Sequence, residues 1–327
     1  MLKNKILFGA NSFLIVIIFE TFMMNLKIVG AGYLGIRIGV LWKESFPDAS
    51  VYLKTKHNNI KRNELWQSFG FIPLSQEEEN DSNRVTAPFV VFSAPLTNIT
   101  DYAKEVQIGI EKDWDFNSDG TKEFVFTGSG GVYAENSGGI VDENSETKSV
   151  SQRSKALISA EKIVEQFGGT TIRFGGLYTK TRGAHNFWLG NKENNFASSP
   201  HGLNNLIHYD DAARCVIKVL LKTLNGRYMN WLKTDFKKSS LFLASDGIPI
   251  SRQNICQVAL KNPFYQEKCM PVFSGDAALV DGKMYSTYHI RMALDWKPVF
   301  TSFEVFMLYR YDEEMEISEF FEFNMDT

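Results

Sequence analysis

Three glycines near the start of the chain have the spacing of a phosphate-binding turn. Gly30, Gly32 and Gly35 follow the short apolar segment 26–29 and open a stretch with helical character that ends near Ser45. In such a turn the first glycine permits a tight bend, the second lets the backbone approach a diphosphate, and the third allows close packing of helix on strand. Free N–H groups at the helix start favour an anion. The pattern predicts a dinucleotide site, with a purely structural glycine turn as the alternative.

The residues expected to contact the dinucleotide come from this turn and from the end of a later apolar strand. They are Gly30, Gly32, Tyr33, Leu34, Gly35, Ser93 and Ala94. The strand expected at 50–53 indicates which dinucleotide binds, because an NAD site usually has an acidic residue at this strand's end. Here Lys54 and Lys56 follow instead. A lysine attracts the 2′-phosphate that a carboxylate repels, so we expect these two lysines to bind NADP(H) in preference to NAD(H). The alternative is that both lie in solvent.

A serine after another buried strand, 124–126, is the next candidate for chemistry. This strand continues into Ser129 and, three residues later, Val132-Tyr133. Together with the glycine turn and a mid-chain strand ending in Ala94-Pro95, it resembles the extended short-chain dehydrogenase/reductases, a family that includes sugar-nucleotide epimerases and dehydratases. Three further segments resemble that family in the expected order: 139–143, 173–178 and 205–212. The resemblance covers about residues 26–305. It implies a Rossmann fold and a serine at position 129 that hydrogen-bonds a small polar substrate.

The sequence departs from the family at its catalytic pair, a Tyr-x-x-x-Lys on the helix expected at 151–167. If Lys155 takes the lysine position, Ser151 replaces the tyrosine; if Glu161 is the anchor, Arg153 and Leu157 take the two positions. We prefer the second register, which is similar to an atypical branch of the family that lacks the tyrosine. Two hypotheses therefore stay open: an NADP-dependent oxidoreductase or epimerase/dehydratase-like enzyme, and a non-catalytic NADP-binding sensor, scaffold or assembly subunit.

Without the tyrosine, proton transfer would need another group, because a serine hydroxyl is far less acidic than a phenol. The candidates are Tyr133, Tyr178, His185 and His208. We select Ser129, His185 and Tyr133 as catalytic residues, since His185 stands in a loop expected over the substrate and titrates near neutral pH. His208 is interpreted as structural. Arg182, Asn186 and Asn205 are the predicted substrate-binding residues.

The elements that must position these residues alternate between strands and helices, which predicts an α/β fold with a doubly wound parallel Rossmann sheet and a small C-terminal substrate-side lobe. Residues 25–180 with 206–245 form the expected NAD(P)-binding domain, and 181–205 with 246–310 the expected lobe. The polar stretch 183–202 reads as a long loop. The acidic tail 311–327 is expected to be disordered.

Composition limits the remaining possibilities. A net charge of −3 and a pI of about 6.0 argue against a nucleic-acid partner. The three cysteines form no motif, so neither a disulfide framework nor a metal site is predicted. The apolar run 13–19 is too short for a membrane span, and residues 1–24 are a leader or a misassigned start. The compartment is cytoplasmic, or an organelle such as a plastid if this segment targets the chain. The resemblance also makes a homodimer possible.

Overall fold

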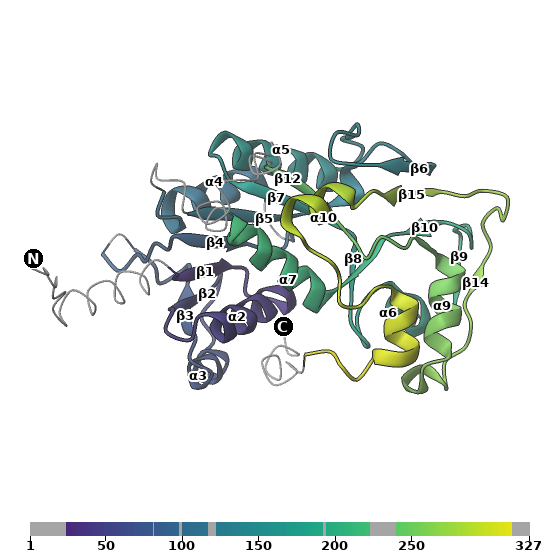
Figure 1. Cartoon of the computed structure of the whole chain (residues 1–327), viewed down its shortest axis with the longest axis horizontal. Helices are drawn as coiled ribbons and strands as arrows, with labels where there is room; N and C mark the ends of the chain where they lie inside the picture. Colours follow the sequence, from purple (N-terminus) through teal and green to yellow (C-terminus); the bar gives the residue numbers. More distant parts are fainter. Residues whose placement is uncertain are drawn as a thin grey trace, which may run out of the picture.

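The computed structural model describes residues 24–80, 82–97, 100–116, 122–191, 194–222 and 240–315. Its centre is a seven-stranded sheet, and Figure 1 shows helices on both sides of it. The strands are β1 (Leu26–Val29), β2 (Val51–Thr55), β3 (Ile72–Ser75), β4 (Phe89–Phe92), β5 (Glu123–Ser129), β7 (Thr170–Phe174) and β12 (Leu241–Ala244).

All neighbouring strands of this sheet run parallel, in the order β12-β7-β5-β4-β1-β2-β3. The strand order reverses between β1 and β4, the point at which open α/β sheets bind their ligands. β4 is buried along its whole length, as its run of Phe and Val residues requires of a strand covered on both faces. The predicted doubly wound parallel sheet is therefore confirmed.

Two pairs of helices cover the faces of the sheet. α2 (Tyr33–Ser45) and α7 (Tyr209–Leu220) pack on one face, and α4 (Tyr102–Asp113) and α5 (Gln152–Gln166) on the other (Figure 1). α3 (Ile60–Ser68) joins β2 to β3. A buried ion pair of 2.6 Å between Arg37 Nε and Asp210 Oδ1 fixes α2 against α7.

A second lobe has a hydrophobic core of its own, built around Tyr178, Trp188, Tyr265, Phe303 and Phe306. Its helices are α6 (Ala184–Gly190), α9 (Arg252–Leu260), η3 (Pro263–Tyr265), α11 (Phe303–Val305) and η4 (Phe306–Arg310). The prediction that residues 183–202 form one long loop is thus partly wrong. Since His185, Trp188 and Leu189 are buried on one side of α6, packing stabilises a helix where the polar composition predicted none.

Short two-stranded ladders lie outside the central sheet. The pairs are β8 (Gly176–Tyr178) with β11 (Leu206–His208), β10 (Leu203–Asn204) with β13 (Ile250–Ser251), β9 (Asn195–Phe196) with β14 (Val272–Phe273), and β6 (Ser137–Val141) with β15 (Gly282–Tyr285). The turn η1 (Gly130–Val132) follows β5, and α10 (Tyr288–Leu294) follows β15.

The beginning of the predicted acidic tail is ordered against the sheet domain. Met315 N donates to Asp210 Oδ2 over 2.8 Å, and Lys180 N donates to the Glu314 carboxylate over 3.1 Å. The prediction of a disordered tail is therefore wrong for residues 311–315, because these polar contacts and the packing of Met315 on the core compensate the ordering of the chain. The rest of the predicted tail, and residues 1–23 of the predicted leader, lie outside the described residues.

No helix in the described part of the chain is both long and apolar enough to cross a bilayer.

Candidate functional site

The glycine turn lies at the carboxyl end of β1, against the segment that follows β4. Gly30 has a φ of 87°, and a Cβ on it would come within 2.2 Å of Ala94 N. Ser93 Oγ donates to Gly30 O over 2.8 Å, and Gly30 N donates to Lys54 O over 2.9 Å. Only glycine permits both this backbone conformation and this close approach.

The other two glycines differ in their surroundings. A Cβ on Gly35 would approach Ile28 Cγ2 to 2.9 Å, so this glycine allows α2 to pack on β1. A Cβ on Gly32 would meet no atom within 4 Å, so the backbone here faces open space. The first turn of α2 carries no acidic residue. An open helix start without an acidic residue, after a tight turn, fits a dinucleotide diphosphate at the backbone N–H groups of Tyr33 and Leu34, whereas the Gly32 N–H donates to Gly30 O over 2.8 Å.

Lys54 does not lie where a 2′-phosphate could reach it. Its Nζ is buried and lies 2.5 Å from Glu79 Oε2 and 2.8 Å from Asp113 Oδ1. Lys27 Nζ contacts the same two carboxylates at 2.8 and 2.6 Å. Burial opposes ionisation of Glu79, but hydrogen bonds from Lys27 and Lys54 outweigh it and lower the pKa of its carboxyl. The predicted cofactor role of Lys54 is therefore wrong: its charge is already compensated inside the protein.

Two other cations stand at this end of β2. Lys56 is exposed, as predicted for a phosphate ligand. Arg62, on α3, donates to Thr55 Oγ1 over 2.8 Å and to His57 O over 2.9 Å. Its guanidinium also lies 4.7 Å from the centroid of the Trp66 ring. No sequence pattern pointed to Arg62, because only the fold brings the start of α3 back to the strand end.

Arg182 lies at the glycine turn rather than over Ser129. Its guanidinium carbon is 4.6 Å from the centroid of the Tyr33 ring, which also stacks with Arg37 at 4.4 Å. The loop that carries Arg182 is closed by hydrogen bonds from its own N–H and that of Thr181 to Thr179 Oγ1. Tyr33 opens α2, so this exposed guanidinium is placed to contact a cofactor phosphate more readily than the predicted substrate.

Ser129 ends β5, on the same sheet edge as the glycine turn and with only β4 between the two strands. It is half-buried, and its Oγ accepts a hydrogen bond of 3.2 Å from Gly131 N. This position suits the predicted contact with a substrate oxygen.

Tyr133, the nearby phenol, is not suited to the predicted proton transfer. Its side chain is 3 % exposed, and its hydroxyl has no hydrogen-bond partner among the described residues. Burial raises the pKa of Tyr133 to about 12, although Arg173 stacks on its ring at 4.8 Å. Both oxygens of Glu161 bind this Arg173, at 3.0 and 2.7 Å. Tyr133 thus belongs to the packing beneath the site, which corrects its assignment as a catalytic residue.

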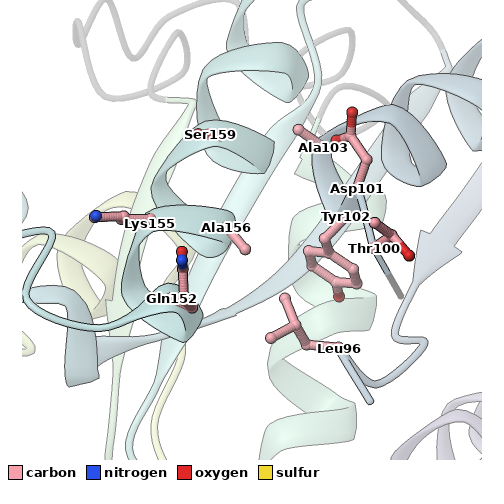
Figure 2. Close-up of a pocket in the computed structure, with 9 residues that line it drawn as sticks. All are labelled: Leu96, Thr100, Asp101, Tyr102, Ala103, Gln152, Lys155, Ala156 and Ser159. Atoms are coloured by element: carbon pink, nitrogen blue, oxygen red, sulfur yellow. The ribbon is translucent and has the colours of Figure 1, made fainter. Parts of the chain in front are cut away.

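The helix α5 presents no catalytic tyrosine or lysine toward this packing. Leu157 is buried in the core beside Val132, whereas Lys155 lines a cavity of about 410 Å³ between α4 and α5. Figure 2 shows this cavity and the Lys155 ammonium directed away from Tyr102. These positions favour the second register, in which Leu157 stands at the family's lysine position. Tyr102 closes the other wall, and its hydroxyl donates to Ala94 O over 2.7 Å, which helps to hold the segment against the glycine turn.

The remaining predicted residues mostly serve the second lobe. His185 is fully buried between Tyr265 and Phe303, its Nε2 lies 3.0 Å from Lys180 O, and burial lowers its pKa to about 4. A catalytic role for His185 is therefore not supported. Asn186 is exposed on α6. His208 is buried, and its Nδ1 accepts from Asp210 N at the start of α7, in agreement with a structural interpretation.

Asn205 holds a strand instead of a substrate. Its Nδ2 donates to Lys283 O over 2.8 Å and its Oδ1 accepts from Tyr285 N over 2.8 Å, so its amide binds the backbone of β15 on both sides of one residue. The predicted substrate contact is corrected accordingly. The sequence does not point to Tyr285, because this residue contacts Gly130 only as a result of the pairing of β15 with the distant β6.

Among the described residues, no group of three or more His, Cys, Asp or Glu side chains could hold a metal ion.

No protein-family model matches the sequence, and no curated protein matches it either. Solved structures do share the fold. A conserved protein of unknown function from Silicibacter pomeroyi aligns over 90 % of this chain and 99 % of its own, with a TM-score of 0.64 and 16 % identity. A UDP-glucuronic acid 4-epimerase from Bacillus cereus, in complex with NAD and UDP-glucuronic acid, covers 88 % and 98 % with a TM-score of 0.64 and 14 % identity.

A dTDP-glucose 4,6-dehydratase from Bacillus anthracis, in complex with NAD, covers 89 % of this chain and 97 % of its own, with a TM-score of 0.63 and 11 % identity. At such identities the likeness shows the fold: this chain has the extended Rossmann architecture of the NAD-dependent epimerases and dehydratases, as its motifs predicted.

Proposed function

We propose that this protein binds NADP(H) at the glycine turn and acts as an oxidoreductase or epimerase/dehydratase-like enzyme on a small polar substrate. One observation carries the proposal: at the strand-order reversal, a backbone that faces open space at Gly32 lies on the same sheet edge as Ser129. The bound nicotinamide would supply or accept a hydride. Ser129 would orient the substrate oxygen.

Three groups of contacts would hold the cofactor. The N–H groups of Tyr33 and Leu34 would face the diphosphate, and Arg182, stacked on Tyr33, would add a positive charge beside it. Lys56, exposed at the end of β2, would bind the 2′-phosphate and favour NADP(H) over NAD(H).

Calorimetric titration of the full chain with NADPH and NADH tests this assignment. We expect Lys56→Glu to weaken NADPH binding about tenfold or more, because it replaces attraction of the 2′-phosphate by repulsion, and to leave NADH binding nearly unchanged. Lys61→Glu is the matched control, since it makes the same charge change at an exposed position of α3. An equal loss of affinity for NADPH and NADH, or an equal loss of NADPH affinity in both variants, would argue against a 2′-phosphate contact at Lys56.

A non-catalytic NADP-binding sensor, scaffold or assembly subunit is the second candidate. It is favoured by Leu157, which stands at the family's lysine position and can neither donate a proton nor hold a ribose. Binding of NADPH without reduction of any compound in a panel of aldehydes and ketones would support this alternative. We also propose a homodimer formed through helices that flank the sheet, which light scattering of the titrated sample tests.

A further inference from the structure

We propose that Tyr285, carried by β15, is the proton donor of the site and replaces in function the tyrosine that α5 lacks. This inference rests on the proposed oxidoreductase function. It assigns a catalytic role to a residue on the C-terminal side of the chain, far in sequence from the helix on which the family carries its tyrosine.

The first observation is the contact between Tyr285 and the turn after β5. A Cβ placed on Gly130 would come within 2.3 Å of the Tyr285 hydroxyl oxygen and 2.4 Å of its Cζ. Glycine at position 130 therefore lets the phenol lie directly on the backbone next to Ser129. The Ser129 hydroxyl and a phenol hydroxyl that lies against the next residue can both reach the oxygen of one substrate.

The second observation is that the backbone of β15 is fixed on both sides of Met284. Asn205 accepts from Tyr285 N and donates to Lys283 O, each over 2.8 Å, and Tyr285 pairs with Val141 of β6. A catalytic group has to be held in its productive geometry by such surrounding contacts. Asn205 is thus a positioning residue.

The third observation concerns the charges around the phenol. Arg173 stacks on Tyr133, whose ring packs edge-on against Tyr285 at 6.2 Å between centroids. Lys283, two residues before Tyr285 on the same strand, donates to Tyr133 O over 2.8 Å. Burial and the neighbouring Tyr133 raise the pKa of Tyr285, and Arg173 opposes this shift. The phenol therefore keeps its proton at neutral pH, as a proton donor must, and unlike the buried Tyr133 it is only half-buried.

In the reducing direction the carbonyl carbon of the substrate accepts a hydride from the bound NADPH, and the carbonyl oxygen takes the proton of the Tyr285 hydroxyl. The C=O double bond becomes CH–OH, and the tyrosinate left behind regains a proton from solvent. Ser129 donates a hydrogen bond to the same oxygen throughout.

The test combines a spectroscopic readout with turnover. We would incorporate 3-fluorotyrosine into the full chain and assign the resonance of position 285 by its loss in Tyr285→Phe. Addition of NADP⁺ should shift this ¹⁹F resonance, because the nicotinamide would lie beside the phenol. The resonance of Tyr309, which is 75 % exposed on η4, is the internal control and should stay in place.

Turnover of the carbonyl panel with NADPH gives the second readout. Tyr285→Phe, which removes only the hydroxyl, should lower kcat about 100-fold or more, the usual contribution of a general acid. Tyr288→Phe, three residues further and 67 % exposed, is the matched control and should retain full activity. NADPH affinity should be the same in both variants.

The outcomes separate this inference from the proposed function. Bound NADP⁺ that leaves the resonance of position 285 unchanged, or a Tyr285→Phe variant with undiminished kcat, overturns the role of Tyr285 while the cofactor assignment stands. A shift of that resonance supports the inference even if no compound of the panel turns over. A chain that binds neither nucleotide overturns both.

Discussion

Asp246 shows at the scale of a single residue how burial changes chemistry. It follows β12 and is 2 % exposed. Its Oδ1 accepts from Ile248 N over 2.9 Å, but its Oδ2 has no hydrogen-bond partner among the described residues. Burial raises the pKa of this carboxyl to about 7.

The pH dependence of stability follows from this shift. An unfolded Asp has a pKa of about 3.9, so between about pH 4 and 7 the unfolded state has lost a proton that the folded state keeps. Through Asp246, the free energy of unfolding therefore falls as the pH rises through this window. We expect Asp246→Asn to reduce that fall, measured by urea unfolding at pH 5 and pH 7.5.

The control for this prediction is Asp276→Asn. Asp276 makes the same kind of contact, from Ala278 N to its Oδ1 over 2.8 Å, but it is exposed. A pH dependence that Asp246→Asn and Asp276→Asn change equally would show that burial of Asp246 is not its cause.

Residue chemistry could be predicted from the sequence only where it depends on local backbone. The glycine turn could be predicted, because its spacing specifies the conformation directly. The roles of Lys54, His185 and Asn205 could not, because each depends on partners that approach from distant segments: Glu79 and Asp113, Tyr265 and Phe303, and the backbone of β15. A lysine or histidine looks the same in a sequence whether it lies in solvent or in a core.

At the scale of elements, a buried group of four charges joins β1, β2, the segment after β3 and the end of α4. It consists of Lys27, Lys54, Glu79 and Asp113. Such a group is stable only when complete, since removal of one partner leaves a buried charge without compensation.

We expect Lys54→Met to lower the free energy of unfolding by about 3 kcal/mol, measured by urea denaturation at pH 7. Lys56→Met, two residues along the same segment but exposed, should have little effect. Equal stability of the two variants would contradict a structural role for the charges. Because Lys54 lies away from the phosphates, its replacement should also leave the ratio of NADPH to NADH affinity unchanged.

The elements themselves could largely be predicted where apolar residues run continuously. β1 and β5 contain the predicted apolar segments 26–29 and 124–126, and β4 is a continuous run of Phe and Val. α6 could not be predicted, because it lies in the polar stretch 183–202 and is stabilised by packing on the second core. β6 and β15 could not be predicted either, because each forms a strand only by pairing with the other, which is distant in the sequence.

At the scale of the whole molecule, the C-terminal segment 311–315 joins the second lobe to the sheet domain. Glu314 Oε2 accepts from Lys180 N at 3.1 Å and lies 3.2 Å from His208 Nε2. Met315 O lies 3.4 Å from Arg37 Nη2. The loop that carries Arg182 is therefore anchored by a segment more than a hundred residues further along the chain.

We expect Glu314→Ala to lower the free energy of unfolding by about 1 kcal/mol, because it leaves the half-buried backbone N–H of Lys180 without its partner. It should also weaken NADPH binding, since the position of Arg182 depends on this loop. Glu313→Ala should change neither quantity measurably, because the exposed Glu313 forms a surface ion pair with the half-buried Arg310. Thermal unfolding and calorimetry of the two variants measure both effects.

The contact between Arg37 and Met315 spans 278 residues. During synthesis on the ribosome, α2 therefore emerges long before the residues that pack around it. The Arg37 guanidinium lacks its ion pair with Asp210 and its hydrogen bond to Met315 O until both residues have been synthesised. Contacts between such distant positions slow folding and expose apolar surface in the meantime. We expect this protein to complete its fold only after residue 315 has left the ribosomal exit tunnel and to depend on chaperones until then.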